Sequence, residues 1–322
     1  MWKFLSLIKK HLTWAIPIIM ILGLVFGTMF DLSFLKAAVM PLTFLMVYPM
    51  MVNLQIEKIF STDSIKAQVV TQFINFAIIP FIAFGIAKIF FSGSPYIILG
   101  LLFVSLLPTS GMTISWTGFA KGNLNAAIQM TVLGLILGSL ATPLYAKFLL
   151  GASIEIPMLK VFTTIMIVVL LPMIAGVLTR KLLVKNYGKE IYQKRFKQHF
   201  PQLSTLGVLG IVFVAMALKA KTITSNPTIL LDFLIPLVIL YALNFLLSTV
   251  VAKMFFNRGD GIAVVYGTVM RNLSVALAIA MSAFPTNGAE IAIIIALAYI
   301  IQVQAAAWYV KFSDKIFGSV KE

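Results

Sequence analysis

Long apolar segments recur along the whole chain and are separated by short polar connectors. Ten of these segments are long enough to cross a bilayer as helices, because about 20 apolar residues span its hydrocarbon core. They cover residues 12–30, 33–54, 67–91, 95–114, 123–149, 157–183, 202–220, 228–256, 261–284 and 288–312. The pattern therefore predicts an all-α, polytopic membrane protein in which residues 1–322 form a single transmembrane domain.

The ten predicted helices form two groups of five. Two homologous groups with an odd number of spans insert in opposite orientations, which is the inverted-repeat plan of many secondary transporters. We expect one repeat over residues 12–149 and a second over residues 157–312, with a basic cytoplasmic linker at residues 184–201. Pro17 and Gly23 in the first helix have counterparts in Pro172 and Gly176 of the sixth, which is weak support for the repeat.

The basic residues are distributed unequally between the two sides of this topology. With a cytoplasmic N-terminus, 18 of the 25 lysines and arginines lie on the inner side and Arg271 lies within a span. The outer side holds Lys36, Lys88, Lys147, Lys160, Lys219 and Lys221. This bias predicts a multi-pass protein of the plasma (inner) membrane with both termini in the cytoplasm. The net charge of +15 belongs to connectors between spans, so the lipid bilayer is the expected partner and nucleic acid is not.

The fourth and ninth predicted helices occupy equivalent places in the two repeats, and both contain helix-breaking residues. Pro108 and Gly111 in the fourth helix, and Gly267 in the ninth, are expected to open the helices. Irregular backbone at membrane depth is tolerated only where it faces protein or a wet cavity. Paired interruptions therefore predict that helices 4 and 9 are broken and cross at a substrate site. Close helix packing is the alternative explanation of the small residues.

Arg271 lies near the middle of the ninth predicted helix. A buried arginine costs about 2.5 kcal/mol or more to insert, so it needs a cavity or a negative partner. No carboxylate is placed at the same depth, since Asp232 lies only a turn inside the outer end of the eighth helix. An anionic substrate would supply the missing partner through the forked donors of the guanidinium. Two alternatives remain: Arg271 caps carbonyls of the broken helix, or Asp232 reaches it.

Polar side chains near the two interruptions form the candidate site. Besides Arg271, the candidate substrate-binding residues are Asn272, Thr109, Ser110, Thr113, Asn75 and Ser274. The candidate ion-lining residues are Thr131, Ser115 and Thr268. These oxygens could hold Na⁺, although sodium sites commonly also include a carboxylate. Charge alone could drive export instead, because an interior-negative potential drives a unit negative charge outward by about 2.3 kcal/mol per 100 mV.

The residues that most enzymes and metal sites require are scarce. The chain has no cysteine, and its two histidines, His11 and His199, lie in basic segments outside the predicted spans. No phosphate-binding glycine loop precedes a lysine, and no nucleophile, histidine and acid are assembled in the spans. The sequence therefore predicts no catalytic residues, metal or cofactor.

Two segments resemble signatures of the arsenite exporter family. Residues 39–52, with Met46, Tyr48 and Pro49, resemble its second-helix signature. The residues that resemble its fourth-helix motif are Pro108, Met112, Trp116, Thr117, Lys121, Gly122 and Asn123. Both segments also resemble the wider bile acid:sodium symporter superfamily. That resemblance implies a ten-helix inverted repeat in which helices 1, 2, 6 and 7 move against helices 3–5 and 8–10.

Several positions depart from the patterns of these relatives. Thr109 stands where arsenite exporters carry an essential cysteine, and Ser274 stands where they carry a glutamate. In the sodium-coupled branch, Gly267 replaces a sodium-binding glutamate and Arg271 replaces a glutamine. Ile114 replaces an asparagine that binds sodium there. A fixed guanidinium thus stands where a relative would hold a sodium ion.

We therefore expect a secondary transporter or uniporter of a small anionic solute, either an organic anion or an oxyanion, working by alternating access. One alternative is an arsenite or antimonite efflux permease with altered ligands, which resistance of a sensitive host would reveal. Another is a sodium-coupled organic anion symporter. A sensor or receptor that does not transport is a third, and saturable flux in liposomes would exclude it.

Overall fold

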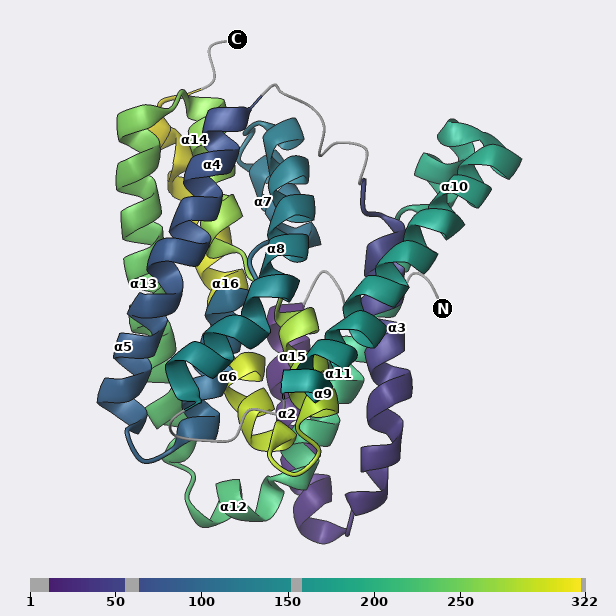
Figure 1. Ribbon diagram of the computed structural model, residues 1–322, viewed down its shortest axis with the longest axis vertical. Coiled ribbons are helices and arrows are strands. Elements are labelled where there is room, and N and C mark those ends of the chain that lie inside the picture. Colours follow the sequence, from purple (N-terminus) through teal and green to yellow (C-terminus); the bar gives the residue numbers. More distant parts are fainter. Residues whose placement is uncertain (1–11, 56–63, 152–157, 320–322) are drawn as a thin grey trace. The chain divides into compact units, whose positions relative to one another are not determined.

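A computed structural model of the protein describes residues 12–55, 64–151 and 158–319 (Figure 1). Within these ranges the chain forms helices and loops, and the only β-type pairing is an isolated antiparallel bridge between Pro108 and Arg271. The all-α prediction is confirmed for these residues. The two compact units into which the chain divides are described separately below.

The helices are long and apolar enough for a multi-pass membrane protein. Seven helical segments of the described ranges could cross a membrane: Ser33–Val52, Ile65–Phe91, Leu124–Leu150, Leu159–Phe196, Phe200–Leu218, Ile229–Phe255 and Gly288–Phe317. Three shorter apolar helices, Trp14–Met29, Pro95–Leu106 and Leu273–Ala283, lie within the first, fourth and ninth predicted spans. Residues 107–110 and 270–272, which fall within the fourth and ninth predicted spans, are not helical.

The first unit contains residues Met1–Leu54, Pro157–Leu231 and Ser274–Ala296. Its elements are α2 (Leu12–Met29), η1 (Ser33–Ala38), α3 (Val39–Val52), α9 (Met158–Ile165), η4 (Met166–Leu170), α10 (Leu171–Ile191), η5 (Tyr192–Phe196), α11 (Phe200–Leu218), α12 (Ala220–Ser225), most of α15 (Leu273–Ala283) and the start of α16 (Gly288–Phe317). These are predicted helices 1, 2, 6 and 7, together with parts of the ninth and tenth.

Glycines bring the helices of the first unit close together. A Cβ atom on Gly27 would lie 2.3 Å from the Ala217 carbonyl oxygen, so α2 approaches the backbone of α11 at this point. A Cβ atom on Gly207 would lie 2.4 Å from the Met46 backbone nitrogen, where α11 meets α3. Close backbone contact of this kind is how helices associate in a membrane, where lipid is as apolar as the side chains.

The predicted linker at residues 184–201 is largely helical. The sixth span was predicted to end at residue 183, but α10 continues to Ile191 and a π-helical turn follows to Phe196. Hydropathy marks where a helix leaves the apolar region, and lysine, arginine and leucine are good helix formers beyond that point. Gly188 interrupts the helix with a φ of 81°, a value that glycine adopts without strain.

The second unit contains residues Gln55–Ile156, Asp232–Leu273 and Leu297–Glu322. Its elements are α4 (Ile65–Phe73), η3 (Ile74–Ile78), α5 (Ile79–Phe91), α6 (Pro95–Leu106), α7 (Gly111–Phe119), α8 (Leu124–Leu150), α13 (Ile229–Phe255), α14 (Arg258–Val269) and the remainder of α16. Helix α14 packs against α4, α7 and α8, and all of its residues from Gly261 to Val269 are buried. The candidate substrate-binding and ion-lining residues predicted from the sequence all belong to this unit, except Ser274.

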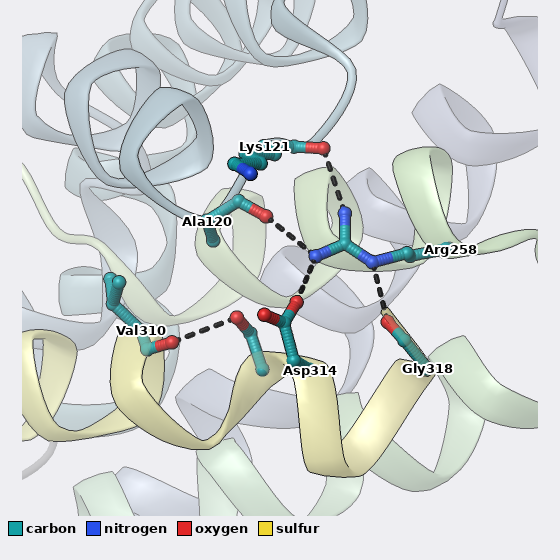
Figure 2. Close-up of polar contacts among 7 residues, drawn as sticks. Ala120, Lys121, Arg258, Val310, Asp314 and Gly318 are labelled. Atoms are coloured by element: carbon teal, nitrogen blue, oxygen red, sulfur yellow. Dashed lines mark hydrogen bonds and ion pairs between the residues drawn. The ribbon is translucent and has the colours of Figure 1, made fainter. Parts of the chain in front are cut away.

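Arg258 joins three helix ends of the second unit (Figure 2). Its guanidinium donates to the carbonyls of Ala120, Lys121 and Gly318 at 2.7–3.2 Å and pairs with Asp314. The unpaired carbonyls at the C-terminal ends of α7 and α16 thereby find donors at the first residue of α14. This contact fixes the far end of the short helix α7, whose near end borders the site.

Candidate functional site

Two non-helical segments of the second unit pair with each other. One connects α6 to α7, and the other connects α14 to α15. The Thr109 backbone N–H donates to the Met270 carbonyl, and the Asn272 N–H donates to the Leu107 carbonyl, both at 2.7 Å. Each segment thus satisfies backbone groups that the other leaves unpaired, as irregular backbone at membrane depth requires.

Local sequence explains why α7 starts where it does. Ser110 is the N-cap, since its Oγ accepts from the Met112 N–H at 3.2 Å while the Thr113 hydroxyl accepts from the Ser110 N–H at 3.1 Å. This reciprocal pair is a capping box. Thr109 has a φ of 63°, a strained value for a β-branched residue. Its hydroxyl points at α8, within 3.3 Å of the carbonyls of Met130 and Thr131.

Arg271 is buried, with 2% of its surface exposed. Its Nη1 donates to the Asn75 side-chain oxygen and to the Ser105 carbonyl, both at 3.0 Å. Its Nη2 is also buried and has no hydrogen-bond partner among the residues that the structure describes. Across the described parts of the chain, no carboxylate forms an ion pair with Arg271. One arm of the guanidinium is therefore held by protein, and the other arm is buried without an acceptor among the described residues.

The backbone of Arg271 is held by a side chain that the sequence did not single out. The Gln302 oxygen accepts from the Arg271 N–H at 2.7 Å, and the Gln302 amide nitrogen donates to the Arg271 carbonyl at 3.3 Å. The Tyr241 hydroxyl donates to the same Gln302 oxygen at 2.9 Å. The available signal was the pair Gln302 and Gln304 in the apolar helix α16, because an amide buried in such a helix needs partners.

Two asparagines satisfy the last carbonyls of α14. Asn75 donates to the Gly267 carbonyl at 3.0 Å, and Asn244 donates to the Thr268 carbonyl at 3.1 Å. Asn75 lies in the π-helical turn η3, a form of backbone often found at functional sites. The Asn75 side chain thus contacts both the end of α14 and the guanidinium of Arg271.

Gly267 does not itself interrupt a helix, contrary to its expected role. It lies inside α14, which continues to Val269. A Cβ atom at this position would lie 2.6 Å from the Met130 sulfur and 3.1 Å from a methyl carbon of Thr71. The glycine makes room for the Met130 side chain. Sodium-coupled relatives are expected to carry a glutamate at this position, and here Met130 and Thr71 occupy the space beside it.

The remaining predicted residues differ in their surroundings. The Thr131 hydroxyl donates to the Ala127 carbonyl of its own helix and lies 3.5 Å from the Ser110 carbonyl. Thr268 donates to Ser248 or to carbonyls of its own helix. Ser115 is exposed and donates to Gly111 one turn earlier. Ser274 begins the part of α15 that belongs to the first unit.

Comparison with known proteins agrees with the resemblance seen in the sequence. A model of the family described as "Sodium Bile acid symporter family" matches residues 40–226. The chain is 24% identical to the arsenical-resistance protein Acr3 of Alkaliphilus metalliredigens, over 97% of this chain and 94% of that protein. Identity to Acr3 of Corynebacterium glutamicum is 22%, over 76% and 70%. It is 28% to sodium/bile acid cotransporter 7-B of Xenopus laevis, over 56% and 53%. The chain therefore belongs to the Sodium Bile acid symporter family of membrane transporters.

Proposed function

We propose that the protein is a secondary transporter or uniporter of a small anion, and that Arg271 pairs with the charge of that anion. The observation that carries this proposal is the buried Nη2 of Arg271, for which no described residue provides an acceptor. A buried cation without a counter-ion is costly, so an anion that reaches Nη2 would relieve that cost.

The contacts of Nη1 support a binding role beyond simple capping. The Ser105 carbonyl and Asn75 hold Nη1, which orients the fork of the guanidinium and leaves Nη2 and its edge for a carboxylate or oxyanion. Capping of a carbonyl, one of the alternatives from the sequence, accounts for Nη1 and leaves Nη2 unexplained. Asn272, Thr109, Ser110, Thr113 and Ser274 stay as proposed lining residues.

A ten-helix architecture is part of the same proposal. Two inverted five-helix repeats would place the non-helical segments, residues 107–110 and 270–272, in corresponding helices that cross at the substrate. Alternating access in the plasma membrane, with both termini cytoplasmic, would expose this point to each side in turn.

Sodium coupling is not required in this proposal. The Met130 sulfur and Thr71 occupy the space beside Gly267 that a glutamate ligand would need. The guanidinium supplies a permanent positive charge in the same region, so an anion would have its counter-ion without Na⁺. Charge movement alone would then drive the anion out of an interior-negative cell.

The similarity to Acr3 over 97% of the chain favours a second candidate, efflux of arsenite or antimonite. Thr109 and the absence of cysteine argue against it, because trivalent arsenic prefers thiolate ligands. Growth of an arsenite-sensitive host expressing the protein separates the two candidates. Resistance that persists in Arg271→Gln would favour the metalloid.

Ligand-induced thermal stabilisation of the purified protein tests the main proposal. Carboxylates, sulfonates, oxyanions and arsenite are compared with and without sodium, in the native protein and in Arg271→Gln. We expect a stabilising shift by one class of anion that needs no sodium and vanishes in Arg271→Gln. Arg195→Gln is the control, since it removes an exposed arginine of the first unit and should keep the shift. A shift that survives in Arg271→Gln refutes the proposal.

A further inference from the structure

A pocket of about 430 Å³ lies in the first unit, away from the residues assigned above. Three connections of that unit line it: the turn from α2 into η1, the end of α11 with the start of α12, and the turn from α15 to α16. We propose that this pocket is a second anion-binding site, and that it takes an organic anion with a compact apolar group. The site goes beyond the proposed function because it needs no contribution from Arg271.

Lysines are concentrated in this pocket. Lys36, Lys219 and Lys221 line it, and they are three of the six basic residues that the sequence assigns to the outer side. Basic residues are disfavoured on the outer side of a membrane protein. The presence of three lysines in one pocket is therefore not explained by membrane topology. Binding of an anion would explain it.

Two of the three lysines are available to a ligand. Lys219 forms an ion pair with Glu290 at 3.2 Å. Lys36 and Lys221 are exposed, and neither forms an ion pair with a carboxylate in the part of the chain that the structure describes. An anion in the pocket would therefore meet two ammonium groups that have no ion-pair partner among the described residues, with Asp31 as the acid that opposes it.

Asp31 is the acidic residue that lines the pocket, and it sets a limit on anion affinity. Its carboxylate accepts from the Ser33 N–H at 3.0 Å and from the Ser33 hydroxyl. These bonds, and then the charges of Lys221 and Lys36, hold the pKa of Asp31 below its usual value. Asp31 thus stays ionised and opposes an anion, so its removal should strengthen binding.

The walls of the pocket determine the kind of anion. Leu32, Met281, Phe284 and Pro285 contribute apolar surface, and the Met281 and Phe284 side chains are largely buried. A fully hydrated inorganic ion would gain nothing from these walls. A carboxylate or sulfonate attached to an apolar group would bury that group there, and the volume lies within the range of small-molecule sites.

Calorimetric titration of the purified, full-length protein with benzenesulfonate tests the site. The titration is done in the Arg271→Gln background, so that any binding at the first site is absent. We expect saturable binding that weakens roughly five-fold in Lys36→Gln and again in Lys221→Gln, since one contact between unit charges in water is worth about that factor. Lys36→Arg should retain it, and sulfate should bind more weakly than benzenesulfonate.

Two further variants should act in the opposite direction. Asp31→Asn can still accept from Ser33 and should tighten binding, and Glu290→Gln should do so by freeing Lys219. Binding that none of these four charge changes alters would overturn the site, as would the absence of binding in the Arg271→Gln background. Because the titration is done without Arg271, its result does not depend on whether an anion binds at Arg271. The proposed function and this second site can therefore be refuted independently.

The same chemistry is found on a lipid headgroup. Repeating the titration in nanodiscs of neutral and of anionic phospholipid distinguishes the sources. Equal affinity in both supports a soluble anion. If an anionic lipid occupies the pocket, benzenesulfonate should bind more weakly in anionic nanodiscs than in neutral ones, and Lys36→Gln should abolish this difference. That result would overturn the proposal of a soluble ligand and assign the pocket to a lipid.

Discussion

Replacement of Gln302 by leucine should destabilise the protein by removing the support of the broken segment at Arg271. Gln302 makes three buried hydrogen bonds, to the N–H and carbonyl of Arg271 and from the Tyr241 hydroxyl. Leucine has a similar volume and no polar atoms, so all three groups lose this partner. Lipid cannot replace it at membrane depth.

The size of the effect follows from two reference values. An orphaned buried polar group costs about 1–3 kcal/mol in soluble proteins. Hydrogen bonds between membrane helices average only about 0.6 kcal/mol and reach about 1.7 kcal/mol. Since two of the three groups that lose Gln302 belong to the non-helical segment at Arg271 and the third is the buried Tyr241 hydroxyl of α13, we expect a loss of about 2–5 kcal/mol. For a chain of 322 residues the melting temperature should fall by roughly 3–7 °C, since the entropy of unfolding is about 2.1 cal/mol/K per residue.

Thermal unfolding of purified Gln302→Leu, with Gln304→Leu beside it, measures this effect. Gln304 lies two residues later on α16 and is exposed, so its replacement should change stability by less than about 0.5 kcal/mol. The ligand-induced shift at Arg271 should also be lost in Gln302→Leu, because the backbone that carries the guanidinium is no longer held. Equal melting temperatures for the two variants would show that Gln302 does not support the segment.

Three further variants test other parts of the structure. Gly267→Ala should cost about 1–2 kcal/mol, because its Cβ would crowd the Met130 sulfur; an unchanged melting temperature would mean that α8 can move away. Arg258→Lys should speed hydrogen exchange at residues 118–122 and 314–319, since an ammonium cannot reproduce the guanidinium fork; unaltered exchange would contradict the role drawn in Figure 2. Ser110→Ala should lower stability by about 1 kcal/mol through loss of the N-cap, a loss that Ser110→Asp should largely avoid.

The sequence alone determined the fold class and drew attention to the helix interruptions. A bilayer requires long apolar segments, so their number and spacing predict a polytopic helical protein without tertiary information. Arg271 stood out because a charge is rare in such segments, and Pro108 because Thr109, Ser110 and Gly111 follow it directly. The resemblance of residues 39–52 and of the fourth-helix motif pointed to the family to which the chain belongs.

Only the tertiary structure decided how these residues are paired. Gln302 holds the backbone of Arg271 from 31 residues away, and the Ser105 carbonyl accepts from its guanidinium across 166 residues. Neither contact follows from periodicity, which shows the face of a helix on which a residue lies and not its partner in another helix. The role of Gly267 was misjudged for the same reason, because glycine both breaks helices and admits close neighbours, and only the position of the Met130 sulfur distinguishes the two.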